Sequence, residues 1–334
     1  MKVESGNRGR VAMRVGLLSA LGALWAVCSG TGSLSIAAAR SEKPPGEPVA
    51  ESAEEPPEGK RRPLRELLYG ATPEERERLA EERRRLSAAA AAFGTDPTAI
   101  IGYYQLTYGH SAFTNNLRLE SATAVVQVPL TPNWFVRATL PYLWADSNQP
   151  GGSTTDGTSD TLVRTAGRLY ASQNVALVIG TDASFPTAAK KGLGTGKYTV
   201  GPGGAVAVPM PRLRSLFFTV LQDFNSVGGD PSRANLHFML VQPVFNTIWS
   251  EHWWTSIQGT FYIDWNNNRK TTLNLQGEVG HNFDNHWNVF AGAGAGVLGQ
   301  DTSLGLDWTV LAGVRWVFMT PLFPERLLEQ FPRK

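Results

Sequence analysis

The sequence predicts an all-β protein, a twelve-stranded antiparallel transmembrane β-barrel with an N-terminal disordered spacer and a short helix. Three observations lead to this fold class. Stretches of about 10 residues alternate apolar and polar side chains from residue 97 onward, as strands with two different faces do. Short turns alternate with longer polar connections along the same region. The chain also begins with an export signal.

Composition excludes several other classes of protein. The 334 residues carry a net charge of only +2, so no basic surface for nucleic acid is expected. A single Cys rules out a disulfide framework and any zinc site built from cysteines. Beyond the first forty residues no apolar run approaches the length of a membrane-spanning helix.

The first 39 residues have the pattern of a cleaved secretory signal peptide. Basic residues from Lys2 to Arg14 precede an apolar run at 15–27, and small residues end in Ala37-Ala38-Ala39. Residues 40–71 are rich in Pro and Glu and have little to bury, which predicts a disordered spacer.

A helix is predicted over residues 72–96. Thr72 suits the N-cap, Pro73 suits the first turn, and acidic residues follow before an Ala-rich stretch. The apolar stripe is thin and many arginines flank it. Two interpretations stay open: a solvated periplasmic helix, or a helix that enters and blocks a lumen or binds a partner.

The barrel is expected over residues 97–318, with a periplasmic tail at 319–334. In the segment TLNLQGEVGHN, Leu275 and Val279 point to one side, while Gln276 and Glu278 point to the other. Charged residues in mid-strand could not lie unpaired in a dry core, so one face must meet water or line a wet lumen. A secreted β-propeller is the rival interpretation, but its blades need four short strands per unit.

Short polar turns recur about every 38 residues, beginning at Thr131, Ser172, Pro209, Ser250 and Asp284. The other connections are longer, and each short turn is followed by another strand. The longer connections are predicted at Gly109 to Asn115, Asp146 to Ser159, Thr187 to Lys197, Ser226 to Ala234, Asn266 to Lys270 and Leu298 to Leu304. This asymmetry is typical of outer-membrane barrels.

Two groups of aromatic residues fit such a barrel. An aromatic girdle at the membrane interface is expected from Trp134, Trp253 and Trp287, which follow three of the short turns. The end of the last strand, with Gly313, Trp316 and Phe318, resembles the signal that the bacterial outer-membrane assembly machinery reads, except that residues 319–334 follow it.

The middle of the chain resembles a family of outer-membrane transporters related to the phenol-degradation proteins of the MetA pathway. The matching segments are FPTAAKKGLGTGKYTVGPG (185–203), DFNSVGG (223–229), NLHFMLVQPVFN (235–246) and YIDW (262–265). The resemblance covers residues 100–318 and is strongest in the middle third. It implies a small barrel that passes or binds apolar or aromatic compounds, and it supplies no catalytic residues.

Polar residues predicted to face the lumen are the candidates for selectivity. The structural interpretation is a network of salt bridges that fills a narrow barrel, and the functional interpretation is a constriction that selects a solute. Arg164 and Arg168, four apart on one strand face, could seat an anionic group. The full set is Arg118, Glu120, Arg137, Arg164, Arg168, Gln258, Asp264, Gln276, Glu278, Asp307 and Arg315.

No cofactor and no metal site are predicted, because none of the five His pairs with another at ligand spacing. The expected function is a passive, non-enzymatic channel or uptake protein for small solutes in a bacterial outer membrane. Its expected partners are outer-membrane lipid, the assembly machinery and the solute. A purely structural barrel stays open, as does a lipid hydrolase that uses His110 and Ser111, although adjacent strand residues point to opposite faces.

Overall fold

The computed structural model describes residues 73–114, 116–147, 154–284, 286–299 and 305–318. The predicted signal peptide, the predicted spacer and the predicted tail lie outside the described residues. The elements are α3 (Pro73–Ala92), β1 (Gly102–Phe113), β2 (Leu117–Thr131), β3 (Trp134–Ser147), β4 (Thr154–Thr158), β5 (Thr161–Ala171), β6 (Ala176–Phe185), β7 (Lys197–Met210), η1 (Pro211–Leu213), β8 (Ser215–Gly229), β9 (His237–Ile248), β10 (Trp253–Asp264), β11 (Lys270–Asn282), β12 (Trp287–Leu298) and β13 (Leu306–Phe318).

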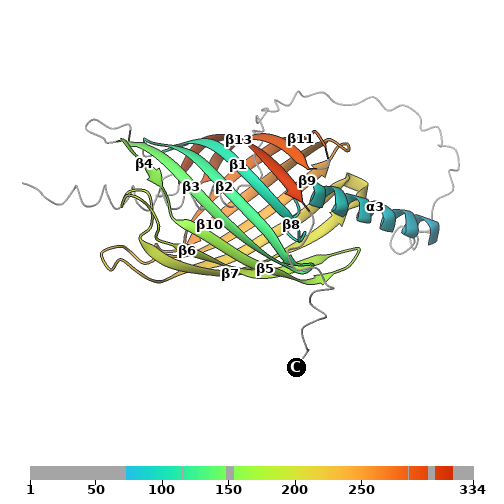
Figure 1. The fold of residues 1–334 in the computed structure, drawn as a ribbon, viewed down its shortest axis with the longest axis horizontal. Coiled ribbons are helices and arrows are strands. Elements are labelled where there is room, and N and C mark those ends of the chain that lie inside the picture. The colour runs from blue at the N-terminus through green and yellow to red at the C-terminus, as the bar shows by residue number, and fades with distance from the viewer. Residues whose placement is uncertain (1–72, 115, 148–153, 285, 300–304, 319–334) are drawn as a thin grey trace, which may run out of the picture.

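The strands form one closed antiparallel barrel, as Figure 1 shows. Apart from β4 and β5, each strand pairs with the next along the chain, and β1 pairs with β13 to close the ring. β4 and β5 are separated only by Ser159 and Asp160, and β3 pairs with both, so the thirteen segments make twelve barrel strands. The predicted fold class is confirmed.

The alternation read from the sequence separates the two faces of the wall. In β10, Ile257 on the outer face is 48% exposed, whereas Gln258 beside it is 1% exposed. β11 follows the same rule, with Leu275 and Val279 outside and Gln276 and Glu278 inside. A strand places successive side chains on opposite faces, so an apolar exterior and a polar interior arise together.

The two ends of the barrel differ. At one end, here called the short-turn end, brief turns join β2 to β3, β5 to β6, β7 to β8, β9 to β10 and β11 to β12. The first residue of β1, Gly102, and the last residue of β13, Phe318, also pair at this end. At the opposite, long-loop end, the β6–β7 loop spans residues 186–196 and the β8–β9 loop spans residues 230–236.

Two of the predicted long connections are wrong in part, because they contain strand residues. The connection predicted from Asp146 to Ser159 includes β4, which pairs with β3. The sequence predicts a polar loop from Gly109 to Asn115, but β1 continues to Phe113 and pairs with β2 as far as Ala112. The inward side chains Ser111 and Phe113 are buried, so the alternation runs further than the polar letters in this segment indicate. The turn itself is tight, with Asn116 at a φ of 61°.

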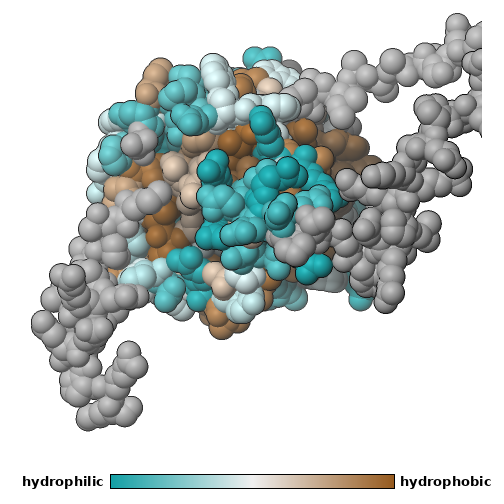
Figure 2. Space-filling model, turned by 90° about the vertical axis from the view of Figure 1, so that its right-hand side faces the viewer, coloured by the Kyte–Doolittle hydropathy of each residue, from teal (hydrophilic) through white to brown (hydrophobic). Residues whose placement is uncertain are grey.

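Helix α3 lies at the short-turn end (Figure 1). Figure 2 faces that end, and hydrophilic surface gathers over the middle of the view, with hydrophobic surface beyond it. Within the described residues, no helix has the length and apolar character that a bilayer crossing requires.

Candidate functional site

The second half of α3 enters the lumen at the short-turn end. Leu86, Ala90 and Phe93 are buried there, while the first half of the helix carries most of the charge and is largely exposed. Their partners are inward residues of the barrel wall, including Phe218 and Trp254. We call residues 86–101 the N-terminal plug. The second half of the helix therefore enters the lumen, while its first half stays solvated.

The end of α3 is fixed to the wall by an arginine. Gly94 adopts a φ of +67° and lets the chain turn, with Thr95 N–H donating to the Ala90 carbonyl. The last carbonyls then face Arg315, whose Nη1 donates to the oxygens of Phe93 and Gly94, both at 2.8 Å. A cation at this helix end also suits the negative end of the helix dipole. Arg315 faces the lumen as predicted, and it is 2% exposed.

The β6–β7 loop folds inward at the long-loop end. Leu193 is fully buried against inward residues such as Leu119 and Leu143. Asp160, at the break between β4 and β5, holds the loop by accepting hydrogen bonds from Thr195 N at 2.6 Å and Thr195 Oγ1 at 2.7 Å. Among the described residues, the lumen thus has an apolar cluster at each end, with polar side chains between.

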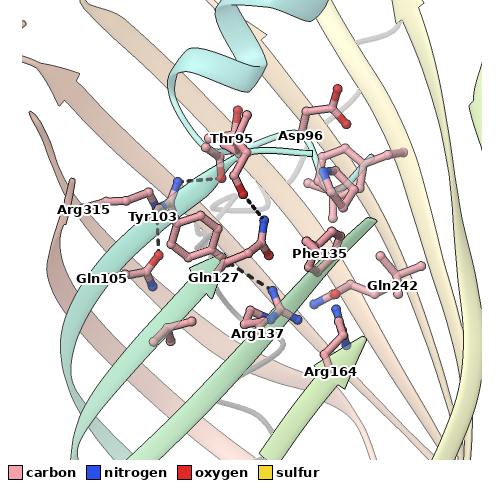
Figure 3. Close-up of a pocket in the computed structure, with 17 residues that line it drawn as sticks. Thr95, Asp96, Tyr103, Gln105, Gln127, Phe135, Arg137, Arg164, Gln242 and Arg315 are labelled. Atoms are coloured by element: carbon pink, nitrogen blue, oxygen red, sulfur yellow. Dashed lines mark hydrogen bonds between the residues drawn. The ribbon is translucent and has the colours of Figure 1, made fainter. Parts of the chain in front are cut away.

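A chamber of about 100 Å³ lies against the plug residues that follow α3 (Figure 3). Residues 94–97 form one side of it. Its other walls come from the first strands and from β8, β9 and β13. Figure 3 shows Arg137, Arg164 and Arg315 around Tyr103 and Phe135, with Gln242 at the far side. The chamber is therefore partly apolar and partly cationic.

One wall of the lumen carries a complete ion-pair network. Arg164 donates to both oxygens of Asp182, each at 2.6 Å, and Asp182 is fully buried. Gln222 joins this pair, donating to Asp182 and accepting from Arg164. Burying these charges is tolerable because each is hydrogen-bonded.

The other lumen candidates are distributed along the wall. Gln258, Gln276 and Glu278 lie buried on the neighbouring strands β10 and β11. Asp264 ends β10, where its carboxylate accepts the N–H of Asn266. All four share the inward phase of their strands, in agreement with the alternation.

Two of the predicted lumen residues face outward. On β2 the inward phase belongs to Leu117 and Leu119, so Arg118 and Glu120 lie on the outer face. Glu120 accepts a hydrogen bond there from Tyr108, which is 50% exposed. The prediction assigns the polar residues to the inside, but the leucines belong to the apolar cluster at the long-loop end, which inverts the usual polarity of the strand.

Asp307 also departs from the prediction. The register between β1 and β13 shifts at this point, with Trp308 opposite Ala112 and Leu306 opposite Phe113. Asp307 is the extra residue of this irregularity and is exposed, while Leu306 fills the inward position. A bulge breaks strict alternation, and the sequence contains no sign of it.

The predicted anion seat of Arg164 and Arg168 is not assembled. Both residues face inward, but Arg164 is committed to Asp182, and Arg168 donates to the Pro132 carbonyl at 2.9 Å. The neighbour of Arg164 is Arg137, directly opposite it on β3. Spacing along one strand could not reveal this pairing, which depends on the register between two strands.

Sequence reasoning missed several residues of the chamber. Tyr103, Gln105 and Gln242 line it, and Asp182 balances its charge. Asp182 had a usable signal, because it is a charged residue in the middle of the apolar strand ALVIGTDASF. The polar residues of β1 were less visible, since tyrosines occupy both of its faces.

The aromatic candidates lie at the short-turn end on the outer face. Trp134, Trp253 and Trp287 are 40%, 49% and 48% exposed. Trp316 stacks on Tyr104, with ring centroids 5.7 Å apart, and Phe318 ends the last strand. Gly313 leaves the space that the ring of Phe290 occupies.

The two residues of the hydrolase alternative lie on opposite sides of the wall. His110 contacts Trp308 on the outer face, with ring centroids 5.1 Å apart. Ser111 is buried on the inner face and shares a hydrogen bond with Thr309 at 2.9 Å. A serine nucleophile needs its base within hydrogen-bond distance, so this pair does not form a catalytic unit.

One solved structure supports the fold, and two others are similar to a lesser degree. An outer-membrane channel from Pseudomonas putida F1 superposes with a TM-score of 0.52 at 15% identity, over 67% of this chain and 97% of that one. The NanC porin gives a TM-score of 0.47 at 10% identity, over 64% and 98% of the two chains. The KdgM porin in complex with disordered oligogalacturonate gives 0.44 at 7% identity, over 64% and 99%.

The likeness to the two porins is too weak to support an argument, and the first match supports the fold. No protein-family model matches the sequence, and no curated protein matches it either. The resemblance to the family related to phenol-degradation proteins therefore stays a prediction. The chain has the fold of an outer-membrane β-barrel, with a lumen that an N-terminal segment enters.

Proposed function

We propose that this protein is a bacterial outer-membrane channel that passes small solutes passively, and that movement of the N-terminal plug opens and closes its lumen. The observation that carries this proposal is the arrangement of the lumen: a polar middle section with a chamber, closed by a separate segment at one end and a loop at the other. A barrel with a purely structural role needs neither a chamber nor an entering segment.

The exterior of the wall supports a membrane location. Large apolar side chains are exposed on nearly every strand, among them Leu106, Leu140, Ile179, Leu221 and Ile257. A soluble protein rarely exposes so continuous an apolar surface, whereas lipid would cover it. The three tryptophans at the short-turn end would then mark the periplasmic interface, and the signal peptide would direct export.

The plug is suited to movement because, among the described residues, side-chain contacts with the wall hold it and strand pairing does not. Its apolar residues near the helix end are mostly alanines, and its polar anchors include Arg315 and Asn288, which donates to the Phe93 carbonyl at 2.9 Å. Passage would require the plug to leave this position while the barrel wall stays closed.

Single-channel recordings in planar bilayers test the proposal. Residues 40–334 should give small or rare current steps, and a chain that lacks residues 40–97 should give larger and more frequent ones. Gel migration that differs between boiled and unboiled samples serves as the control for a folded barrel. A folded barrel without any conductance after the deletion would contradict the channel function and favour a structural role.

A further inference from the structure

The chamber beside the plug combines two kinds of wall. Phe135, Phe218, Val220 and Val244 provide apolar surface, and arginine side chains provide positive charge on the other side. Such a combination matches a ligand with an apolar body and an anionic group, because each part then meets its own kind of surface.

The arginines differ in how far their donors are occupied. Arg164 binds Asp182 through two hydrogen bonds, and Arg315 binds the two plug carbonyls and the Gln105 oxygen. Arg137 donates to the Tyr103 hydroxyl at 3.2 Å. Within the part of the chain that the structure describes, no carboxylate lies within 4.0 Å of Arg137, and its buried Nε has no hydrogen-bond partner.

The position of Arg137 makes the absence of a carboxylate partner unfavourable in free energy. It lies directly opposite Arg164 in the register of β3 and β5, and like charges opposite each other destabilise a sheet. The Asp182 carboxylate forms its hydrogen bonds with Arg164 and Gln222. Asp96 also lines the chamber, but its carboxylate accepts hydrogen bonds from Thr98 N and Thr98 Oγ1. An anion on Arg137 would relieve the repulsion.

We propose that the chamber binds a small organic carboxylate with an apolar body, held by Arg137 through its carboxylate and by Phe135 and Phe218 through its body. The ligand class deepens the proposed channel function and rests on it, since the bound molecule would be a solute in transit. A planar guanidinium suits a carboxylate because two parallel hydrogen bonds can form.

Benzoate is a suitable probe, and benzamide is its neutral counterpart of the same shape. Calorimetric titration of detergent-solubilised residues 40–334 in a chloride-free buffer should show binding of benzoate and much weaker binding of benzamide. Arg137→Gln should weaken benzoate binding by about tenfold or more, because a charge-assisted hydrogen bond is lost. Arg118→Gln on the outer face of the adjacent strand is the matched control and should bind benzoate as the unaltered chain does.

Equal binding of the two probes, or full binding of benzoate by Arg137→Gln, would overturn the proposal. If the Arg137→Gln variant does not show the gel shift of a folded barrel, the ligand proposal is tested by comparing benzoate with benzamide on the unaltered chain. Absence of benzoate binding by a barrel that conducts ions would overturn the ligand proposal and leave the channel function standing. If the unaltered chain binds benzoate but the plug-deleted chain shows no conductance, the channel function is overturned and the binding site stands.

Discussion

The two ends of the lumen are closed in different ways. At the short-turn end, the plug comes from outside the barrel and contacts the wall through Leu86, Ala90 and Phe93, with Arg315 as its main polar anchor. At the long-loop end, the closing segment is a loop that joins β6 to β7, and Asp160, just before the neighbouring strand β5, binds it through Thr195.

This difference indicates which end opens more readily. Within the described residues, the plug continues covalently into the barrel at the start of β1 alone and belongs to no strand pair, so it can leave without changing any strand pairing. The loop is anchored at two strand ends and can only rearrange locally. We therefore expect variants of the plug to change conductance, and variants of the loop anchor to change the mobility of the loop.

The largest effect is expected from Phe93→Ala. Phe93 is 3% exposed within the apolar cluster at the short-turn end, and removal of a buried phenyl ring costs about 3 kcal/mol or more. Because the loss falls on the docking of the plug, the open probability in bilayer recordings should rise strongly. Leu169→Ala, at a side chain 66% exposed on β5, should leave it unchanged. An unaltered open probability in Phe93→Ala would mean that the plug does not limit conduction.

Asp160→Asn tests the other end. The neutral side chain cannot accept all the hydrogen bonds that the carboxylate accepts from Thr195 and the Ala188 N–H, and a bond to a charged group contributes about 2 kcal/mol. The loop should then open locally, and trypsin should cut after Lys190 or Lys191 faster. Asp156→Asn weakens two exposed contacts, the ion pair with Lys190 and the hydrogen bond from the Tyr142 hydroxyl, and should change the cleavage rate little. Equal rates in both variants would show that Asp160 does not hold the loop.

A smaller effect on the plug is expected from Gly94→Ala. A side chain at a φ of +67° costs about 1–2 kcal/mol, and the new Cβ would lie 2.8 Å from Cδ of Arg315. The open probability of Gly94→Ala should be higher than that of the unaltered chain and lower than that of Phe93→Ala. Gly228→Ala, where the nearest atom to a new Cβ is 3.9 Å away, is the control. If the plug docks equally well in the Gly94→Ala variant, the helix-ending turn does not have the role assigned to it.

The smallest effect concerns pH. Burial raises the pKa of the Asp96 carboxyl above its ordinary value of 3.8, and this outweighs the hydrogen bonds from Thr98 and the charge of Arg168. The docked plug therefore favours the protonated form. Docking should be strongest below the ordinary value and should weaken as pH rises through the raised pKa. Asp96→Asn should remove this part of the pH dependence of the open probability, and a profile identical to that of the unaltered chain would exclude Asp96 as its source.

Much of the wall could be predicted from the sequence, whereas the site could be predicted only in part. The alternation placed Gln258, Gln276, Glu278 and Arg315 correctly, because it reflects the geometry of a single strand. It failed at Arg118 and Glu120, where apolar residues fill the lumen, and at Asp307, where the register shifts. In both places the contacts come from other strands, and a single strand contains no record of them.

By itself, the sequence determined the all-β class and the inward and outward faces of most strands, and the alternation of short turns with longer connections predicted the closed barrel. The tertiary structure decided which inward charges meet. Arg164 pairs with Asp182, Arg137 faces Arg164, and Arg315 holds the end of α3. The physical reason is that a side chain's direction depends on its own backbone, while its partner depends on the register and curvature of the whole ring.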